Sequence, residues 1–300
     1  MAELNGKVAV VTGAGRGIGR AVALGLAAQG ARVVVNDLGV AVDGTGTDES
    51  PAQEVVRSIV EAGGEAVANG ADVSDYDDAG KLIHSAIDTF GQLDILVNVA
   101  GILRKQMIFN ITPEEWDAVI RVHLRGTFAT TRHASAYWRE LRQADASHRL
   151  INFTSDTGLY GGPGQPNYAA AKMGILGFTL SCGNALRKYG VTANAIAPVA
   201  ETRMNENPDR SISLYGDTSR APEDVANVVT YLASPDSSWC NGRVIHVAGK
   251  TVSLISNPVV VRQVTSQTPW DIDDLGATMK RVFSTFPQGA EGRYDHLTKK

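Results

Sequence analysis

Little in this sequence suggests a disulfide-stabilised scaffold, a membrane span or a nucleic-acid partner. Cys182 and Cys240 are the only cysteines in 300 residues, too few for a disulfide framework or a cysteine-rich metal site. The six histidines are unclustered, so we predict no metal. A formal charge of −4 gives no electrostatic reason to expect nucleic acid or anionic lipid. No apolar run approaches eighteen residues and the start resembles no targeting segment, so we expect a soluble, cytoplasmic protein with no membrane partner.

Short apolar runs alternate with helical patterns along most of the chain. The first run, at 7–12, is β-branched and bounded by glycine, as buried strands are. Similar runs lie at 31–36, 65–68, 94–98, 149–154, 191–197 and 243–247, and helical patterns lie near 18–30, 51–62, 75–90, 113–142, 168–189 and 222–233. This alternation predicts an α/β fold of the Rossmann type, with a doubly wound, parallel, seven-stranded sheet and helices on both faces.

The alternation stops near residue 250. We therefore expect one dinucleotide-binding catalytic domain over 1–250, and a C-terminal tail over 251–300 that packs on this domain or on a subunit interface. Two polar segments, 39–50 and 199–220, follow predicted strands and are long enough to be functional loops.

The motif TGAGRGIG at 12–19 joins the first predicted strand to the first predicted helix. A plain strand-to-helix turn needs one or two glycines, whereas Gly13, Gly17 and Gly19 have the spacing of a nucleotide-binding loop. The N–H groups at the start of the helix would bind a diphosphate. We assign Arg16 and Ile18, which lie between the glycines, to the same cofactor site.

Asp37 ends the second predicted strand, where a carboxylate would accept hydrogen bonds from the adenosine ribose and repel a 2′-phosphate. Arg16 favours NADP instead, because its guanidinium could bind that 2′-phosphate. The stretch 33–56 contains no Lys or Arg, however, and several carboxylates. The sequence therefore favours NAD over NADP as the cofactor.

A second group consists of Ser155, Tyr168 and Lys172. Tyr168 and Lys172 are four residues apart in a predicted helix and so share one face. An ammonium beside a phenol should lower the pKa of the phenol towards that of a useful base, and Ser155 could bind the reacting oxygen. Alone, such a pair is usually a surface contact, but the upstream nucleotide motif favours catalysis.

Together these motifs make residues 6 to about 250 similar to the short-chain dehydrogenase/reductase family. The resemblance also rests on Asp72-Val73, on Asn98-Val99-Ala100-Gly101 and on Ala197-Pro198. It implies Asp72 and Val73 near the adenine, and Asn98 beside the cofactor ribose. It further implies that Lys172 also bonds the nicotinamide ribose. Other cofactor contacts are implied for Ala100, Gly101, Tyr168, Pro198, Val199 and Thr202.

Two positions depart from the family pattern. Val199 stands where a glycine is usual, and His123 aligns with the asparagine that holds a water in the family's proton relay. A histidine could bind that water or carry the proton itself. With these departures and the 39–50 insertion, the chain looks like the (3R)-hydroxyacyl-CoA dehydrogenase domain of the peroxisomal multifunctional enzyme.

We therefore expect an NAD-dependent oxidoreductase that interconverts a secondary alcohol and a ketone. An apolar substrate lining, expected from Leu103, Met107, Leu159, Tyr160, Pro198 and Met204, suits an acyl-CoA or a hydroxysteroid. The alternatives are an NADP-dependent 3-oxoacyl carrier-protein reductase and a non-catalytic nucleotide sensor. The resemblance implies a homodimer or homotetramer.

Overall fold

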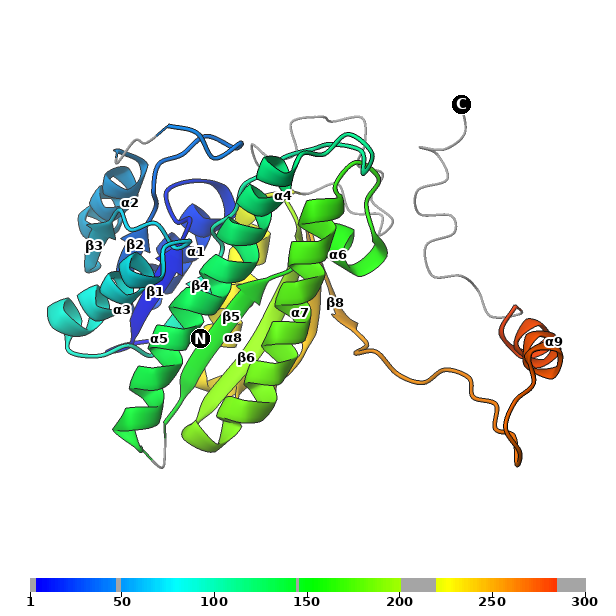
Figure 1. Ribbon diagram of the computed structural model, residues 1–300. Helices are drawn as coiled ribbons and strands as arrows, with labels where there is room; N and C mark the ends of the chain where they lie inside the picture. Colours follow the sequence, from blue (N-terminus) through cyan, green and yellow to red (C-terminus); the bar gives the residue numbers. More distant parts are fainter. Residues whose placement is uncertain (1–3, 47–49, 144–145, 201–219, 285–300) are drawn as a thin grey trace.

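The computed structural model describes residues 4–46, 50–143, 146–200 and 220–284, which form one sheet with helices on both faces (Figure 1). The eight strands lie in the order β3-β2-β1-β4-β5-β6-β7-β8. The first seven are parallel and β8 is antiparallel to β7. Their bounds are Val8–Thr12, Arg32–Asn36, Ala66–Asn69, Ile95–Asn98, His148–Phe153, Val191–Val199, Val244–Ala248 and Thr251–Ile255. The predicted fold class is confirmed, with one strand more than expected.

The strand order reverses beside β1, which pairs with β2 on one side and with β4 on the other. The register aligns Thr12 with Asn36 and Asn98 at the carboxyl ends of these strands. In open parallel sheets, ligands bind in the crevice outside the carboxyl ends at such a reversal. The topology therefore places the binding crevice next to Thr12.

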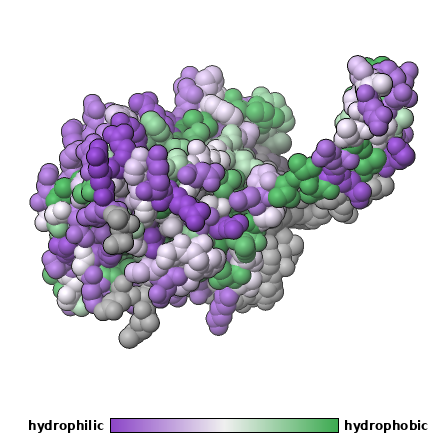
Figure 2. Space-filling model, turned by 90° about the horizontal axis from the view of Figure 1, so that it is seen from below, coloured by the Kyte–Doolittle hydropathy of each residue, from purple (hydrophilic) through white to green (hydrophobic). Residues whose placement is uncertain are grey.

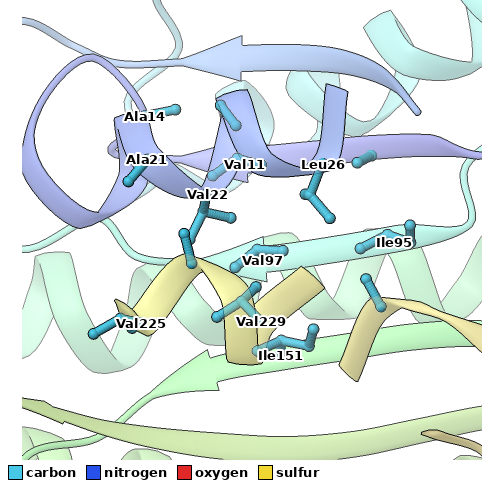
Figure 3. Close-up of a cluster of buried hydrophobic side chains, with 14 of the residues drawn as sticks. Val11, Ala14, Ala21, Val22, Leu26, Ile95, Val97, Ile151, Val225 and Val229 are labelled. Atoms are coloured by element: carbon cyan, nitrogen blue, oxygen red, sulfur yellow. The ribbon is translucent and has the colours of Figure 1, made fainter. Parts of the chain in front are cut away.

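The helices cover the two faces in two groups. Helices α1 (Gly17–Ala28), α2 (Ser50–Glu61) and α8 (Pro222–Ala233) lie on one face, and α3 (Tyr76–Phe90), α5 (Gly126–Leu141) and α7 (Pro166–Leu186) on the other. Figure 3 shows the core under α1 and α8, where Val22 and Val229 meet the strand residue Val97. This packing fixes the start of α1 over the crevice.

The single helix predicted over 113–142 is not continuous. It consists of α4 (Pro113–Ile120), the π-helical turn η1 (Arg121–Arg125) and α5. Thr112 begins α4 with a capping box, since its Oγ1 accepts a hydrogen bond from Glu115 N while the Glu115 carboxylate accepts one from Thr112 N. Wide turns of the η1 type occur mostly at functional sites, and this one carries His123.

The sheet extends beyond the domain boundary expected at residue 250. Gly249, with φ 54°, and Lys250 turn the chain back so that Ala248 pairs with Thr251. A two-residue turn of this kind joins antiparallel strands, and TVSLI then alternates as a strand should. The eighth strand was missed because strands were predicted from their alternation with helices, which ends at residue 250. The alternation of half-buried and exposed side chains within a strand continues over TVSLI.

Beyond β8 the chain leaves the body of the domain (Figure 1). Val259, Val260 and Val261 are exposed along this arm, and α9 (Ile272–Phe283) has no buried residue. Figure 2 shows apolar side chains on the arm where it departs from the domain. The first five residues of the predicted tail thus join the sheet as β8, whereas the described residues that follow are largely exposed in a single chain. Packing of the tail on the domain or on a subunit interface stays a prediction.

Among the described residues, no helix is both long and apolar enough to cross a membrane. The same part of the chain contains no group of three or more His, Cys, Asp or Glu side chains that could hold a metal ion.

Candidate active site

A cavity of about 390 Å³ opens at the carboxyl ends of the central strands. Its walls come from the glycine loop, the ends of β2 and β4, the 39–46 segment, η1 and α7. Of the predicted site residues, the lining includes Gly13, Arg16, Gly17, Ile18, Gly19, Asp37, Asp72, Val73, Ala100, Gly101, His123, Tyr168, Lys172 and Pro198. The two halves of the predicted site, the nucleotide loop and the Tyr/Lys pair, therefore face one cavity.

The glycine loop fits a diphosphate. Helix α1 has no side-chain cap and no acidic residue in its first turn, so its free N–H groups face the cavity lined by Arg16 to Gly19. Gly13 has φ 62°, and a Cβ there would lie 2.8 Å from Ala100 Cα. The loop can thus approach β4 closely only with glycine at this position.

Asp37 holds the glycine loop in place. One carboxylate oxygen accepts a hydrogen bond from Gly15 N at 2.7 Å, and the other accepts one from Gly39 N at 2.7 Å. Each oxygen keeps a free lone pair for a further donor, such as a ribose hydroxyl. The carboxylate therefore fixes the loop and faces the cavity at the same time.

Asp72 and Val73, which the resemblance places near the adenine, line the cavity, and Asp72 Oδ1 accepts a hydrogen bond from Ser74 N at 2.8 Å. The Asn98 side chain does not line the cavity. Its Nδ2 donates to Asn152 Oδ1 at 2.9 Å, and its Oδ1 accepts from Thr130 Oγ1 at 2.8 Å. Asn98 thus ties β4 to β5 and α5, and only its backbone is left to contact a cofactor.

The Ser155, Tyr168 and Lys172 side chains come from the end of β5 and the first turns of α7. Lys172 Nζ lies 5.5 Å from the centre of the Tyr168 ring and donates to Phe153 O at 2.8 Å. Ser155 is the N-cap of the short helix α6 (Asp156–Tyr160), where its Oγ accepts from Thr157 N at 3.2 Å. The backbone of β5 therefore anchors the lysine, and the backbone of α6 anchors the serine.

The pKa of Tyr168 differs from the sequence-based expectation. Burial raises the pKa of Tyr168 to about 12, opposed by a hydrogen bond with Ser155. Burial also lowers the pKa of Lys172 to about 7, because the ammonium loses its hydration. Both shifts follow from burial and oppose ionisation of the phenol.

His123 lies at the centre of the site, buried on η1, with its ring edge against Tyr168 at 5.1 Å between ring centres. Its Nε2 lies 2.8 Å from Ile102 O and 3.1 Å from Ile102 N. Since the carbonyl contact is the shorter, we assign the proton to Nε2, which leaves Nδ1 as a buried acceptor without a partner. Burial lowers the pKa of His123 to about 3, so the ring is neutral at physiological pH.

Gly101 makes room for this histidine, since a Cβ at position 101 would collide with the His123 ring. This explains why the glycine is needed beside η1. Gly101 therefore allows the His123 ring to occupy its place in the site, in addition to the cofactor contact predicted for this glycine.

Some predicted residues lie elsewhere. Val199 ends β6 without lining the cavity, and Thr202 and Met204 lie outside the described residues. Of the described residues in the expected substrate lining, only Pro198 faces this cavity.

The sequence reasoning missed several residues that build the site. Thr12 Oγ1 accepts hydrogen bonds from Val99 N and Ala100 N, at 3.0 and 3.1 Å, and so holds β4's outgoing loop. The 39–50 segment was predicted to be a functional loop, but no contact was assigned to it; in its described part, Val42 O accepts a hydrogen bond from Leu103 N at 2.9 Å, and Val42 lines the cavity. The position of Thr12 at the end of a predicted strand could have indicated its contacts with Val99 and Ala100. No local sequence pattern predicts the contact between Val42 and Leu103.

Asp156 and His246 were also missed. Asp156 follows Ser155 directly, and its Oδ1 lies 3.2 Å from Nε2 of His246, which is fully buried on β7. The contact joins the start of α6 to the sheet beside the serine.

Comparison with known proteins agrees with this geometry. Residues 7–211 match the model of the short chain dehydrogenase family. The hydroxyacyl-CoA dehydrogenase ChsB1 of Mycobacterium tuberculosis is 46% identical over 94% of this chain and 90% of its own. The peroxisomal multifunctional enzyme type 2 of Mus musculus is 44% identical over 77% of this chain, which spans only 30% of that enzyme. A short chain dehydrogenase structure from Mycobacterium avium superposes with a TM-score of 0.84 at 45% identity, covering 95% of this chain and 97% of that one.

Proposed function

Because the chain belongs to the short-chain dehydrogenase family, an oxidoreductase family whose members bind a nicotinamide cofactor, we propose that it oxidises a (3R)-hydroxyacyl-CoA to the 3-oxoacyl-CoA with NAD. The observation that carries the proposal is one cavity lined both by an uncapped helix start with its glycine loop and by the Tyr168/Lys172 pair. A binding module needs the first of these features but not the second.

The cofactor assignment rests on Asp37. Its carboxylate is fixed by Gly15 N and Gly39 N at the edge of the cavity, where a 2′-phosphate would meet a negative charge. Arg16, the residue that favours NADP, lies in the loop between the glycines on the same cavity. We weigh the fixed carboxylate above it, so NAD is the expected partner and the NADP-dependent 3-oxoacyl carrier-protein reductase is the alternative.

Tyr168 takes the hydroxyl proton of the alcohol and Ser155 holds the same oxygen. A bound oxidised nicotinamide would supply the hydride acceptor and a positive charge that would favour ionisation of the buried phenol. Lys172, anchored on Phe153 O, keeps its Nζ beside the phenol ring and can pass a proton when it is charged. In reduction, Tyr168 returns the proton to the carbonyl oxygen.

His123 binds the water of the proton relay through Nδ1. The ring is locked by Ile102 O and too weakly basic to become charged, so it accepts a hydrogen bond and does not carry the proton itself. This proposal selects one of the two roles that the sequence allowed.

The substrate class is supported by relatives named as hydroxyacyl-CoA enzymes and by apolar residues beside the cavity, including Val40, Ile102 and Tyr168. We expect the (3R) enantiomer to react faster than the (3S). NADH formation from the two enantiomers tests this directly, and activity confined to hydroxysteroids would favour the steroid alternative. If the protein binds the cofactor but turns over no alcohol or ketone, the alternative of a non-catalytic nucleotide sensor is favoured.

We also propose that the protein is a cytoplasmic homodimer or homotetramer in which the tail packs on a neighbouring subunit. The exposed apolar side chains of the arm and of β8, such as Val252 and Leu254, support a second copy as the cover. Light scattering should show an oligomer, and a chain ending at Lys250 should be less stable to heat. A monomer at micromolar concentration would contradict this.

A further inference from the structure

Arg104 is a guanidinium that lines the catalytic cavity and is not part of the catalytic set. It follows Ile102 and Leu103 on the segment leaving β4, and its side chain faces the same space as Tyr168 and His123. Its Nε is buried, and no described residue accepts a hydrogen bond from it. A buried charged donor without an acceptor is costly, which indicates that an anionic ligand completes it.

Asp43, a negative charge in the same cavity, is already engaged elsewhere. Asp43, on the 39–46 segment, lines the cavity with Arg104, but its Oδ1 accepts hydrogen bonds from Thr45 N and Thr45 Oγ1, at 2.9 and 2.7 Å. Those two bonds, and less strongly the charge of Arg104, hold the pKa of Asp43 below its usual value. No ion pair within 4.0 Å joins Arg104 to an acidic residue in the described chain.

The Arg104 backbone is fixed on both sides. Asn167 Nδ2 donates to Arg104 O at 3.2 Å, and Gln106 N donates to Gly164 O at 2.9 Å. Asn167 immediately precedes Tyr168, so the position of Arg104 is tied to the catalytic helix. Arg121, the first residue of η1, adds a second positive charge to the same lining.

We propose that Arg104 forms a phosphate-binding subsite in the wall of the cavity. A planar guanidinium with free donors matches a phosphate oxygen pair. The phosphate could belong to the CoA part of the substrate or to the diphosphate of the dinucleotide. The subsite deepens the proposed function, on which the first of these sources depends.

The test compares Arg104→Gln and Arg104→Lys with wild type, and uses Lys105→Gln as the matched control. Lys105 is the neighbouring residue, exposed and absent from the cavity lining. Three quantities are measured for each protein: the Kd of NADH by fluorescence titration, the KM of a (3R)-hydroxyacyl-CoA, and the KM of the same acyl group on N-acetylcysteamine, which lacks phosphate.

If the phosphate is that of CoA, Arg104→Gln raises the KM of the CoA thioester roughly 10- to 100-fold and leaves the other two quantities unchanged. If it is that of the cofactor, the same variant raises the Kd of NADH by a similar factor and affects both thioesters equally. In both cases Arg104→Lys restores part of the loss, and Lys105→Gln behaves as wild type. Wild-type values for all three quantities in a folded Arg104→Gln would overturn the subsite. So would a fall in kcat that is the same for both thioesters and comes with no change in the Kd of NADH or in either KM.

Failure of the proposed function is distinguishable from failure of the subsite. If the wild-type protein oxidises neither thioester, the Kd of CoA by calorimetry and the Kd of NADH still measure phosphate binding. The subsite then stands if Arg104→Gln weakens either ligand by about tenfold or more, and falls if it weakens neither.

Discussion

Replacement of Asp37 by Asn should weaken NADH binding by roughly 10- to 100-fold, although the two side chains have nearly the same shape. The carboxylate accepts hydrogen bonds from Gly15 N and Gly39 N, both at 2.7 Å. An Asn amide has only one oxygen, so one of the two N–H groups would face an NH₂ donor instead. The affinity loss stated comes from the further hydrogen bond that a ribose hydroxyl would donate to the carboxylate, because a bond to a charged group contributes about 1.5–3 kcal/mol and weakens when the charge is removed.

The assay is fluorescence titration of NADH and NADPH into wild type, Asp37→Asn and the surface control Asp78→Asn. NADPH affinity should fall less than NADH affinity, because removal of the negative charge relieves the repulsion of a 2′-phosphate. Asp37→Ser combined with Leu38→Arg should then reverse the preference. Unchanged NADH affinity in Asp37→Asn would refute the loop-locking role, and a wild-type preference for NADPH would refute the cofactor assignment.

Other substitutions test the remaining parts of the site and of the fold. Tyr168→Phe should lower kcat by orders of magnitude with NADH binding nearly intact, whereas Lys172→Ala should impair both; a Tyr168→Phe enzyme with most of its activity would exclude the mechanism. For His123, Asn should retain more activity than Ala in kcat measurements because it can still bind a water, and equal activities would remove His123 from the relay. Burial lowers the pKa of His148 to about 4 from its usual 6.5. Its neutral form therefore stabilises the fold fully above pH 6.5. This contribution to the free energy of unfolding is lost as the pH falls from 6.5 to 4, by at most about 1.4 kcal/mol per pH unit. His148→Phe, which can still stack on Trp138, should therefore show a shallower fall of Tm over that range, and a slope equal to that of wild type would contradict this.

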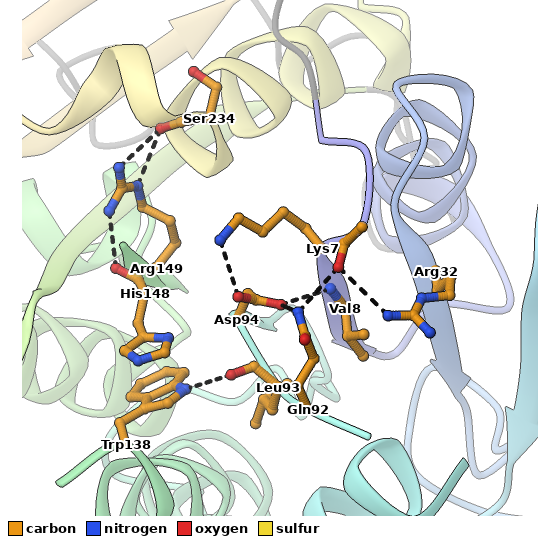
Figure 4. Close-up of polar contacts among 11 residues, drawn as sticks. Lys7, Val8, Arg32, Gln92, Leu93, Asp94, Trp138, His148, Arg149 and Ser234 are labelled. Carbon is orange, nitrogen blue, oxygen red and sulfur yellow. Dashed lines mark hydrogen bonds and ion pairs between the residues drawn. The ribbon is translucent and has the colours of Figure 1, made fainter. Parts of the chain in front are cut away.

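His148 lies at the amino ends of the strands, away from the cavity (Figure 4). Arg149 is buried there and donates to Ser234 O at 3.0 and 3.1 Å, while Asp94 accepts from Lys7 Nζ and Val8 N. These contacts join β5, α8 and β1 below the core. Changes at His148 thus report on stability without touching the active site.

Local patterns in the sequence predicted the parts of the fold that depend on local physics. The run VAVVT is β-branched and fully buried as β1, and the distance from the glycines to Asp37 follows from one helix and one strand between them. The Tyr168/Lys172 pair follows from helical spacing alone. In each case the residue types and their spacing are sufficient, whatever the rest of the chain does.

Features that depend on contacts between distant segments could not be predicted in the same way. The π-helical turn at η1 has no proline or glycine within it to mark it, yet it sets the direction of His123. The hydrogen bonds of the Asn98 side chain were not predicted either, because Thr130 and Asn152, which bind it, lie 32 and 54 residues away in sequence. The high pKa of Tyr168 likewise results from burial, which spacing does not reveal.

NADH formation from NAD and a (3R)-hydroxyacyl-CoA, followed by absorbance for wild type and Tyr168→Phe, tests the proposed reaction most directly. The proposed function predicts turnover by the wild-type enzyme, a slower reaction with the (3S) substrate, and almost none with Tyr168→Phe although that variant still binds NADH. Equal rates for wild type and Tyr168→Phe, or turnover by the wild-type enzyme with NADP only, would contradict the assigned chemistry.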